Sequence, residues 1–244
     1  MNLYEQIFLR KSTRSYTGVP VEEETLAAIR AFLASARPLD PGIRVRFEIV
    51  PRSAVRCLCP WTTPQLAAAY TEQREGALEN VGFLLQQLDL YLCSLGLGSC
   101  WLGMGRMNEG PAAESTGKDG LSFAIMLAFG RPKGPHTRKN PSEFRRKSLS
   151  EIADKPDERL EPARHAPSSV NSQPWYFTHD GETLHGYCAQ KNRFGTRFLT
   201  DMNRIDMGIA LAHLYVSNPE TFRFFRLDSA PALKGYAYLG SVSL

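Results

Sequence analysis

The sequence predicts a mixed α and β fold made of two similar halves. A helix, a proline-rich turn, two strands, a long apolar helix and an apolar strand precede the basic segment Arg131–Ser150, and the same order returns after it. Pro38 and Pro167 occupy the matching turns, and Phe47 and Phe177 lie in the strands that follow them. The length of 244 residues allows either two small units or one large domain. The recurring order indicates an internal duplication, although residue identity between the halves is low.

Two amphipathic helices open the first half. Asn2 can cap the first helix, which should end near Arg10, and Pro20 precedes the second, whose first turn is acidic. The inner faces of these helices are formed by Leu3, Ile7, Phe8, Leu26, Ile29 and Leu33. Alternating charged and apolar residues then predict a half-exposed strand over 44–50, and an alanine-rich run predicts a second strand over 64–70.

The strongest periodic signal predicts a long buried helix over 81–95, where apolar residues recur at steps of three and four positions. The apolar run over 121–130 is typical of a strand buried on both faces. A second buried helix is expected over 205–215. Asp206 and His213 interrupt its apolar pattern and are interpreted as core polar groups with hydrogen-bond partners.

The remaining elements of the second half are shorter. A helical segment is expected over 157–165, and His165 at its end is interpreted as a cation at a helix C-terminus. Strands are expected over 175–179, 184–187 and 236–242, the first two joined by a hairpin at Asp180-Gly181.

Composition and charge exclude several classes of protein. Hydrophobic content of 43% and charged content of 22% are ordinary for a globular chain. The net charge of +4 comes without a long Lys/Arg run, so we expect no nucleic-acid partner, although a local anion such as a phosphate remains open. No apolar run reaches the roughly 18 to 20 residues of a membrane span, and no signal-peptide pattern opens the chain. We therefore expect a cytoplasmic protein without a membrane partner.

The cysteines indicate reduced thiols. Their odd number and irregular spacing do not suit a disulfide framework, and Cys57-Leu58-Cys59 lacks a second pair at metal-site spacing. Cys93 and Cys100 are interpreted as small core residues. The five histidines are scattered along the chain, so no metal site is expected.

A cationic cluster follows the first helix. It consists of Arg10, Lys11, Ser12, Thr13 and Arg14. In the structural interpretation, the cations stabilise the C-terminus of the helix by about 0.3–1 kcal/mol each through its dipole. In the functional interpretation, two guanidinium groups, an ammonium and a hydroxyl form a pocket for a phosphate.

A polar turn, Ala166-Pro167-Ser168-Ser169-Val170-Asn171-Ser172-Gln173-Pro174-Trp175, is the second unusual stretch. Its prolines restrict the backbone and its Ser and Asn side chains bond to nearby backbone groups, which predicts an ordered turn. As a structural loop it would cap its own backbone. As a functional loop it would offer hydroxyls, amides and backbone N–H groups to a flat polar heterocycle.

A glycine-rich run follows the predicted helix 81–95. Its spacing does not fit a dinucleotide-binding motif, because the sixth position counted from Gly96 is Trp101 and the run follows a helix rather than a strand. Trp101 and Trp175 could border a ligand, although burial alone would explain both.

With these three stretches together, the chain resembles the FMN-dependent nitroreductase family. It is most similar to the branch of nitroreductases in which two half-sized copies are fused in one chain. The segments that carry the resemblance are 10–14, the run Leu95-Gly96-Leu97-Gly98-Ser99-Cys100-Trp101-Leu102-Gly103 and the polar turn 166–175.

The resemblance implies an α+β, nitroreductase-like fold, with two similar halves packed as an intramolecular pseudo-dimer around long central helices. The first half would span 1–137 and carry the phosphate cluster, and the second would span 138–244 and carry the polar turn. The implied FMN-binding residues, phosphate first and ring second, are Arg10, Lys11, Ser12, Arg14, Arg145, Arg146, Pro167, Ser168, Ser169 and Asn171.

Two departures from the family pattern shape the expected site. The first half has Pro38-Leu39-Asp40-Pro41-Gly42 where a serine and asparagine turn belongs, so one of the two possible flavin sites should be lost. The glycine loop, which the resemblance places with the polar turn, lies here in the other half. The remaining site is therefore expected to lack that loop and to bind FMN weakly or not at all.

The leading hypothesis is an FMN-dependent oxidoreductase that passes hydride from NAD(P)H to a nitroaromatic, quinone or similar small acceptor. Because the cofactor carries the chemistry, no catalytic side chain is assigned. The alternative is a degenerate relative that keeps the fold as a binding or structural module and binds FMN weakly or not at all. Either protein could be a monomer with an internal pseudo-dimer or a homodimer.

Overall fold

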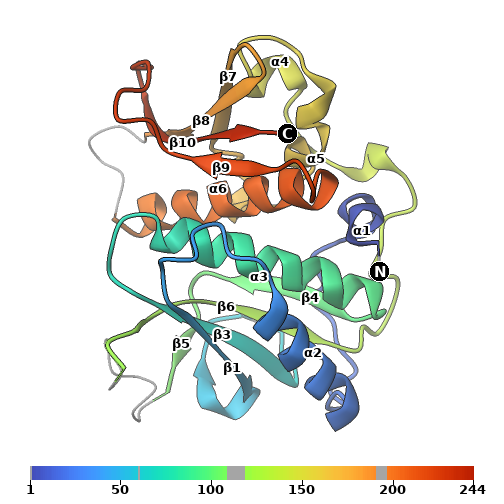
Figure 1. Cartoon of the computed structure of the whole chain (residues 1–244). Coiled ribbons are helices and arrows are strands. Elements are labelled where there is room, and N and C mark those ends of the chain that lie inside the picture. Colours follow the sequence, from blue (N-terminus) through green and yellow to red (C-terminus); the bar gives the residue numbers. More distant parts are fainter. Residues whose placement is uncertain (1, 60, 109–118, 191–196) are drawn as a thin grey trace.

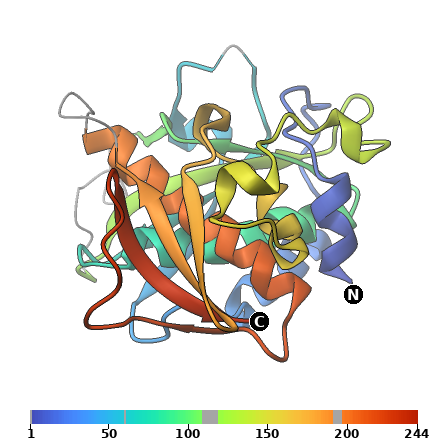
Figure 2. The ribbon, with the colours of Figure 1, turned by 90° about the horizontal axis from the view of Figure 1, so that it is seen from above.

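A computed structural model describes residues 2–59, 61–108, 119–190 and 197–244 (Figure 1). Two long helices, α3 (Ala77–Ser94) and α6 (Arg197–Ser217), lie side by side in the middle of the molecule. A sheet from the first half covers the pair on one side, and a sheet from the second half covers it on the other (Figures 1 and 2). The predicted α+β architecture is confirmed.

Each half contributes one antiparallel sheet of four strands. The first sheet has the order β1-β3-β6-β4, with bounds Val45–Pro51, Gln65–Thr71, Ser122–Gly130 and Gly98–Leu102. The second has the order β7-β8-β10-β9, with bounds Trp175–Asp180, Thr183–Ala189, Tyr236–Ser243 and Arg223–Phe225. In both sheets two hairpin strands precede the long helix and two strands follow it, so the two halves have the same topology. A small ribbon of β2 (Val55–Arg56) and β5 (Arg106–Met107) adjoins the first half.

The shorter helices lie around this arrangement. They are α1 (Leu3–Leu9), α2 (Glu23–Ser35), α4 (Leu149–Ile152) and α5 (Glu161–Arg164). The side chain of Asn2 accepts a hydrogen bond from the Tyr4 N–H, as its predicted cap requires. α1 packs against both α3 and α6, so the cationic cluster that follows it begins at the junction of the two halves.

Two glycines let the central helices touch backbone to backbone. A Cβ added at Gly82 in α3 would overlap the carbonyl oxygen of Ile205 in α6, and a Cβ added at Gly208 would overlap that of Glu79. Ile205 lies three residues before Gly208, and Glu79 lies three residues before Gly82. The two contacts are therefore related by a pseudo-twofold axis, as in the isologous interface of a symmetric dimer.

A buried polar contact also joins the helices. Gln86 Nε2 lies 3.0 Å from His213 Nε2, and His213 Nδ1 lies 2.8 Å from the Pro162 carbonyl oxygen. Because the carbonyl can only accept, Nδ1 carries the proton and Nε2 accepts from Gln86. Burial lowers the pKa of His213 to about 3, so the ring is neutral at ordinary pH. This confirms His213 as a core polar group with partners.

Some boundaries differ from the sequence expectation. α6 begins at Arg197 rather than 205, because Phe198 and Met202 continue the helical spacing of its apolar face ahead of Ile205. The glycine-rich run contains the strand β4 rather than a simple loop. β4 pairs along β6. Because glycine has a low strand propensity, the sequence of this segment does not predict the strand, which forms through its pairing with β6.

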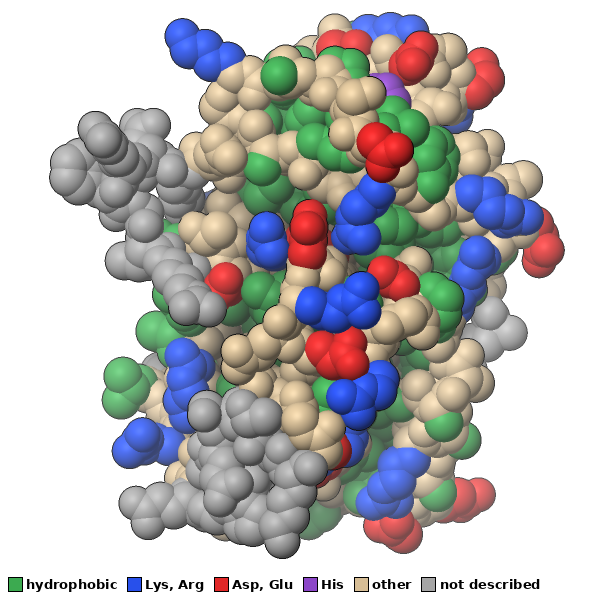
Figure 3. Space-filling model, turned by 60° about the vertical axis from the view of Figure 1, so that its left-hand side comes forward, with side chains coloured by type: hydrophobic (Ala, Val, Ile, Leu, Met, Phe, Trp, Pro, Cys, Tyr) green, Lys and Arg blue, Asp and Glu red, His purple; other side chains and the backbone are tan. Residues whose placement is uncertain are grey.

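None of the helices in the described part of the chain is both long enough and apolar enough to cross a membrane. On the face shown in Figure 3, Lys and Arg side chains alternate with Asp and Glu side chains over the middle of the surface.

Candidate functional site

A cavity of about 170 Å³ lies between the two halves. Its walls come from the segment after α1, from β4 and the residues that follow it, from β6, from the polar turn and from α6. The lining residues are Ser12, Arg14, Cys100, Trp101, Gly103, Ile125, Pro167, Ser168, Ser169, Val170, Met202, Ile205, Asp206 and Ile209. Two stretches singled out in the sequence, more than 150 residues apart, therefore face one space.

The polar turn is held in an unusual backbone conformation. Val170, Asn171 and Gln173 have φ angles of 48°, 57° and 46°. Residues other than glycine rarely adopt this left-handed region, least of all a β-branched one such as Val170, which is also 85% exposed. Strain of this kind persists only where the surroundings impose it, and it is common at functional sites.

Asp206 fixes the turn from α6. Both of its carboxylate oxygens lie 3.0 Å from the Ser169 backbone N–H. Within the turn, Ser168 Oγ accepts a hydrogen bond of 2.9 Å from the Gln173 N–H. The predicted ordered turn and the predicted partners of Asp206 are both confirmed. Ser168 and Ser169 both line the cavity.

Asn171 faces the connector rather than the cavity. Its Nδ2 donates to the Arg145 carbonyl oxygen at 2.8 Å, and its Oδ1 accepts from Arg146 Nη1 at 2.5 Å. Arg145 itself is exposed. These contacts make Asn171 a clamp between the polar turn and the basic connector, a role that residue types alone did not reveal.

Among the described residues that line the cavity, Arg14 is the only cation. It is exposed and has no ion pair in the described part of the chain. Ser12 and Arg14 also line a groove of about 350 Å³, which therefore adjoins the cavity. The other groove residues are Lys11, Thr13, Ser15, Pro132, Lys133, Gly134 and Pro135, with no carboxylate among them. The groove is thus a cationic extension of the cavity.

Arg10 lies inside the protein. It is 2% exposed, and its Nε lies 2.5 Å from Oδ2 of Asp89 in α3. A second guanidinium nitrogen donates to Ser12 Oγ at 2.9 Å, so Arg10 positions a residue of the cavity. Arg10 itself lines neither the cavity nor the groove. The sequence gives no sign of this pairing because Asp89 belongs to a helix far along the chain.

Further guanidinium groups gather behind the polar turn. Arg138 and Arg146 both lie over the ring of Phe144, 4.0 Å and 5.5 Å from its centroid. Burial and the charge of Arg10 lower the pKa of Arg138 to about 10. Burial and the charges of Arg10, Arg138 and Arg164 lower the pKa of Arg146 to about 10. Arg146 Nε is buried without a hydrogen-bond partner among the described residues. Arg138 was not among the predicted site residues.

The glycine-rich run contributes to the same cavity, contrary to expectation. Trp101 and Gly103 line it together with the polar turn, although they come from the first half. A Cβ at Gly103 would meet Met202 Sδ of α6 at 2.9 Å, so glycine allows the two halves to close at this point. The indole Nε1 of Trp101 is buried and has no hydrogen-bond partner in the part of the chain that the structure describes. The site therefore does not lack the glycine-rich segment.

The pseudo-equivalent position in the other half is built differently. Asn80 of α3 takes the place of Asp206, and its Oδ1 accepts from the N–H groups of Leu39 and Asp40 at 2.8 Å and 3.2 Å. Arg226 fills the space beside this turn, with Nη1 4.0 Å from Asp40 Oδ2 and Nη2 against the backbone of Gly76. This turn therefore offers no serine hydroxyls, and an arginine occupies its surroundings.

His165 differs from its predicted role as a cation. It is 1% exposed, and its Nδ1 lies 2.9 Å from the Glu161 carbonyl oxygen. Burial lowers its pKa, and the charges of Arg164 and Arg146 lower it further. The imidazole is therefore a neutral group packed beside Phe144, with 4.4 Å between the ring centroids.

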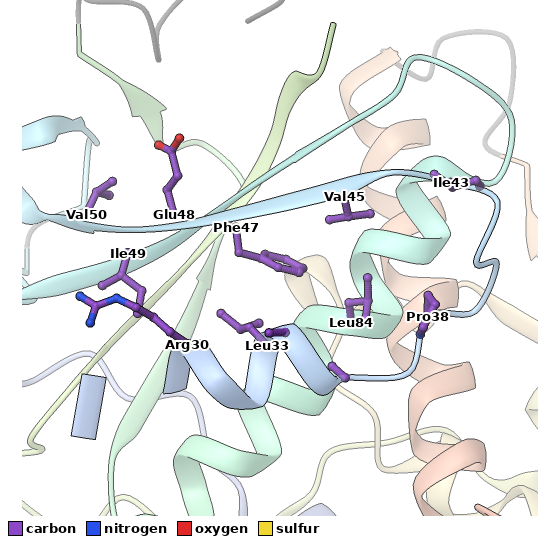
Figure 4. Close-up of a pocket in the computed structure, with 12 residues that line it drawn as sticks. Arg30, Leu33, Pro38, Ile43, Val45, Phe47, Glu48, Ile49, Val50 and Leu84 are labelled. Atoms are coloured by element: carbon purple, nitrogen blue, oxygen red, sulfur yellow. The ribbon is translucent and has the colours of Figure 1, made fainter. Parts of the chain in front are cut away.

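A larger cavity of about 680 Å³ lies elsewhere, between α2 and β1 (Figure 4). Its lining is mostly aliphatic, with Phe47 and with Arg30 and Glu48 as the charged members. It contains none of the residues that the sequence predicted to bind FMN. Among the described residues there is no group of three or more His, Cys, Asp or Glu side chains that could hold a metal ion.

The fold is that of a nitroreductase-type protein. A crystal structure described as "a putative nitroreductase" from Thermotoga maritima aligns over 99% of this chain and 92% of its own, with a TM-score of 0.66 and 19% identity. The family model described as "Putative TM nitroreductase" matches residues 2–218. The chain therefore belongs to this family.

Shorter solved structures match part of the chain. A nitroreductase family protein from Clostridium difficile 630 covers 62% of this chain and 96% of its own, with a TM-score of 0.49 and 19% identity. A nitroreductase with bound FMN from Bacteroides fragilis covers 54% and 89%, with a TM-score of 0.42 and 16% identity. No curated protein matches the sequence.

Proposed function

We propose that this protein is an FMN-dependent oxidoreductase of nitroreductase type. It would take hydride from NAD(P)H and reduce a nitroaromatic, a quinone or a similar small acceptor. The observation that carries the proposal is the single cavity that the cationic segment and the polar turn share. Family membership supports the reaction class.

The residues of the cavity and the groove fit the two parts of FMN. Apolar walls from Trp101, Ile205 and Ile209, with the hydroxyls of Ser168 and Ser169, suit a flat ring that has polar edges. The cationic groove suits a phosphate dianion, because guanidinium and ammonium groups form charge-assisted hydrogen bonds with it. The buried free donors of Trp101 and Arg146 are further unsatisfied groups near the site.

Each predicted residue has a role in this proposal. Lys11, Ser12 and Arg14 would hold the phosphate or the neighbouring ring edge, while Pro167, Ser168 and Ser169 would line the ring. The remaining predicted residues, Arg10, Arg145, Arg146 and Asn171, would shape the site and its potential through the contacts described above.

When bound, FMN supplies hydride-transfer chemistry that no side chain can provide. The chain's own residues would bind FMN, orient it and keep water out of the cavity. Arg14, which lines the cavity, would stabilise negative charge on a flavin ring bound there. Asp206 keeps the polar turn rigid through the Ser169 N–H, and the apolar walls limit access of water. No side chain is required to transfer a proton.

One observation favours the alternative, a fold that works as a binding or structural module. The cavity of about 170 Å³ is smaller than most small-molecule sites, which span about 300–1,000 Å³. If this cavity does not open toward the cationic groove, FMN cannot enter it.

Titration with FMN separates these possibilities. We expect saturable binding with a changed flavin spectrum, and Arg14→Ala should weaken it about 10- to 150-fold, the effect of losing a charged hydrogen bond of about 1.5–3 kcal/mol. Arg30→Ala, an exposed arginine of the other cavity, is the matched control and should bind normally. A chain that stays colourless and ignores added FMN would contradict the proposal. A chain that binds FMN but never oxidises NADH or NADPH would favour the module.

A further inference from the structure

Two thiols outside the proposed flavin site lie in contact. Cys57 Sγ and Cys59 Sγ are 2.8 Å apart, and the Cys59 N–H points to Cys57 Sγ at 3.4 Å. Leu58 between them points outward and is 87% exposed. The backbone thus presents both thiols on one side. They are closer than non-bonded sulfur atoms normally come, and need to approach by only roughly 0.8 Å to reach bonding distance.

The surroundings do not explain this pair as a metal site or as plain core packing. Both thiols are half-buried against an apolar cluster of Val55, Leu66, Leu102, Met126 and Ala128. In the described part of the chain no carboxylate or imidazole joins them as a third metal ligand. Core cysteines elsewhere in the chain, Cys93 and Cys100, are fully buried. Cys57 and Cys59 are thus the thiols that combine mutual contact with access to solvent.

We propose that Cys57 and Cys59 form a reversible disulfide, a two-electron redox site that a low-molecular-weight disulfide such as oxidised glutathione can oxidise. The Cys57 thiolate attacks one sulfur of glutathione disulfide and releases one glutathione. Cys59 then gives up its proton, attacks the Cys57 sulfur of the mixed disulfide and releases the second glutathione. One protein S–S bond replaces the glutathione S–S bond, so two electrons leave the protein and two glutathione thiols form.

The environment assigns different roles to the two cysteines. Burial and the contact with Cys57 raise the pKa of Cys59 to about 11, so Cys59 keeps its proton near neutral pH. Cys57 is therefore the attacking thiol and Cys59 the resolving thiol. Neither step needs a flavin, so the proposal stands or falls separately from the proposed function.

Mass analysis of one tryptic peptide tests the proposal. Cleavage after Arg56 and Arg74 yields residues 57–74, which contain Cys57 and Cys59 and no other cysteine. Native protein is equilibrated in glutathione redox buffers, acid-quenched, alkylated and digested. We expect this peptide to lose two hydrogen atoms in a single transition that follows the Nernst equation for two electrons. Subsequent reduction of the protein should restore the two hydrogen atoms to this peptide.

Single variants test the assigned roles. Cys59→Ser should trap a glutathione adduct on Cys57, while Cys57→Ser should gain much less adduct on Cys59. Cys188→Ser, a half-buried cysteine distant in sequence, should leave the peptide's transition unchanged. The proposal is overturned if the wild-type peptide carries separate glutathione adducts on both cysteines, or stays fully reduced in oxidising buffer. Both of these overturning outcomes are measured on the wild-type chain, so they can be observed even if a variant fails to fold.

Discussion

At the scale of single residues, the ion pair between Arg10 and Asp89 links stability to the candidate site. Both side chains are buried, at 2% and 0% exposure, and Ser99 Oγ donates to the other oxygen of Asp89. Removing one partner leaves an uncompensated charge in the interior. We therefore predict that Asp89→Ala lowers the free energy of unfolding by about 3–5 kcal/mol.

Urea denaturation at neutral pH measures this loss. Glu23→Ala is the matched control, because Glu23 pairs with Arg30 at the surface, where 76% and 51% of the side chains are exposed. Such a pair contributes little. Equal unfolding midpoints for Asp89→Ala and the wild-type chain would show that the pair does not support the fold.

Residue types predicted part of the site and missed the rest for a physical reason. Ser12, Arg14, Ser168 and Ser169 could be singled out because their motifs are local in sequence, and the structure places all four on one cavity. The inward orientation of Arg10 depends on a carboxylate in another element, and no local pattern records that. The neutral state of His165 likewise depends on burial beneath distant side chains.

At the scale of elements, the crossing of α3 and α6 depends on two glycines. A methyl group at Gly82 or Gly208 would overlap backbone atoms of the opposite helix, which cannot rotate away as a side chain can. Alanine normally stabilises a helix interior by roughly 0.5–1 kcal/mol relative to glycine. We predict the opposite sign here, with Gly82→Ala and Gly208→Ala each destabilising the protein strongly.

Thermal unfolding measures whether alanine at these positions lowers the melting temperature, as predicted. Gly134→Ala serves as the control, since an added Cβ there meets nothing within 4 Å. An unchanged or higher melting temperature for Gly82→Ala would contradict the close crossing.

The elements differed in how well the sequence predicted them. The helix over 81–95 and the strand over 121–130 were found because their apolar patterns reflect burial directly, and α3 and β6 confirm them. β4 was hidden because glycine and serine are poor strand formers, and only pairing with β6 makes that segment a strand.

At the scale of the whole molecule, neither half can cover the apolar face of its long helix by itself. α3 and α6 bury their apolar faces against each other, and the cores of both sheets belong to one continuous cluster. We predict that residues 1–137 and 138–244, expressed separately, show no cooperative unfolding transition, because each would expose one long apolar helix.

Co-expression provides the complementary measurement. The two fragments should copurify and regain a single transition, since the helix contact needs no covalent link. A stable, cooperatively folding fragment in isolation would show instead that the halves are independent domains. The repeated order of elements was readable from the sequence, while the boundary at residues 137 and 138 stays a prediction.

The placement of the cavity wall on two halves of one polypeptide has a consequence for how the protein behaves at low abundance. In an assembly of separate subunits, a pocket between them disappears when the subunits dissociate on dilution. Here the tether keeps the opposing walls at a high effective concentration however dilute the protein is. Occupancy of the cavity should therefore depend on the ligand's concentration alone, and a cell could keep a few copies of this chain without losing the pocket.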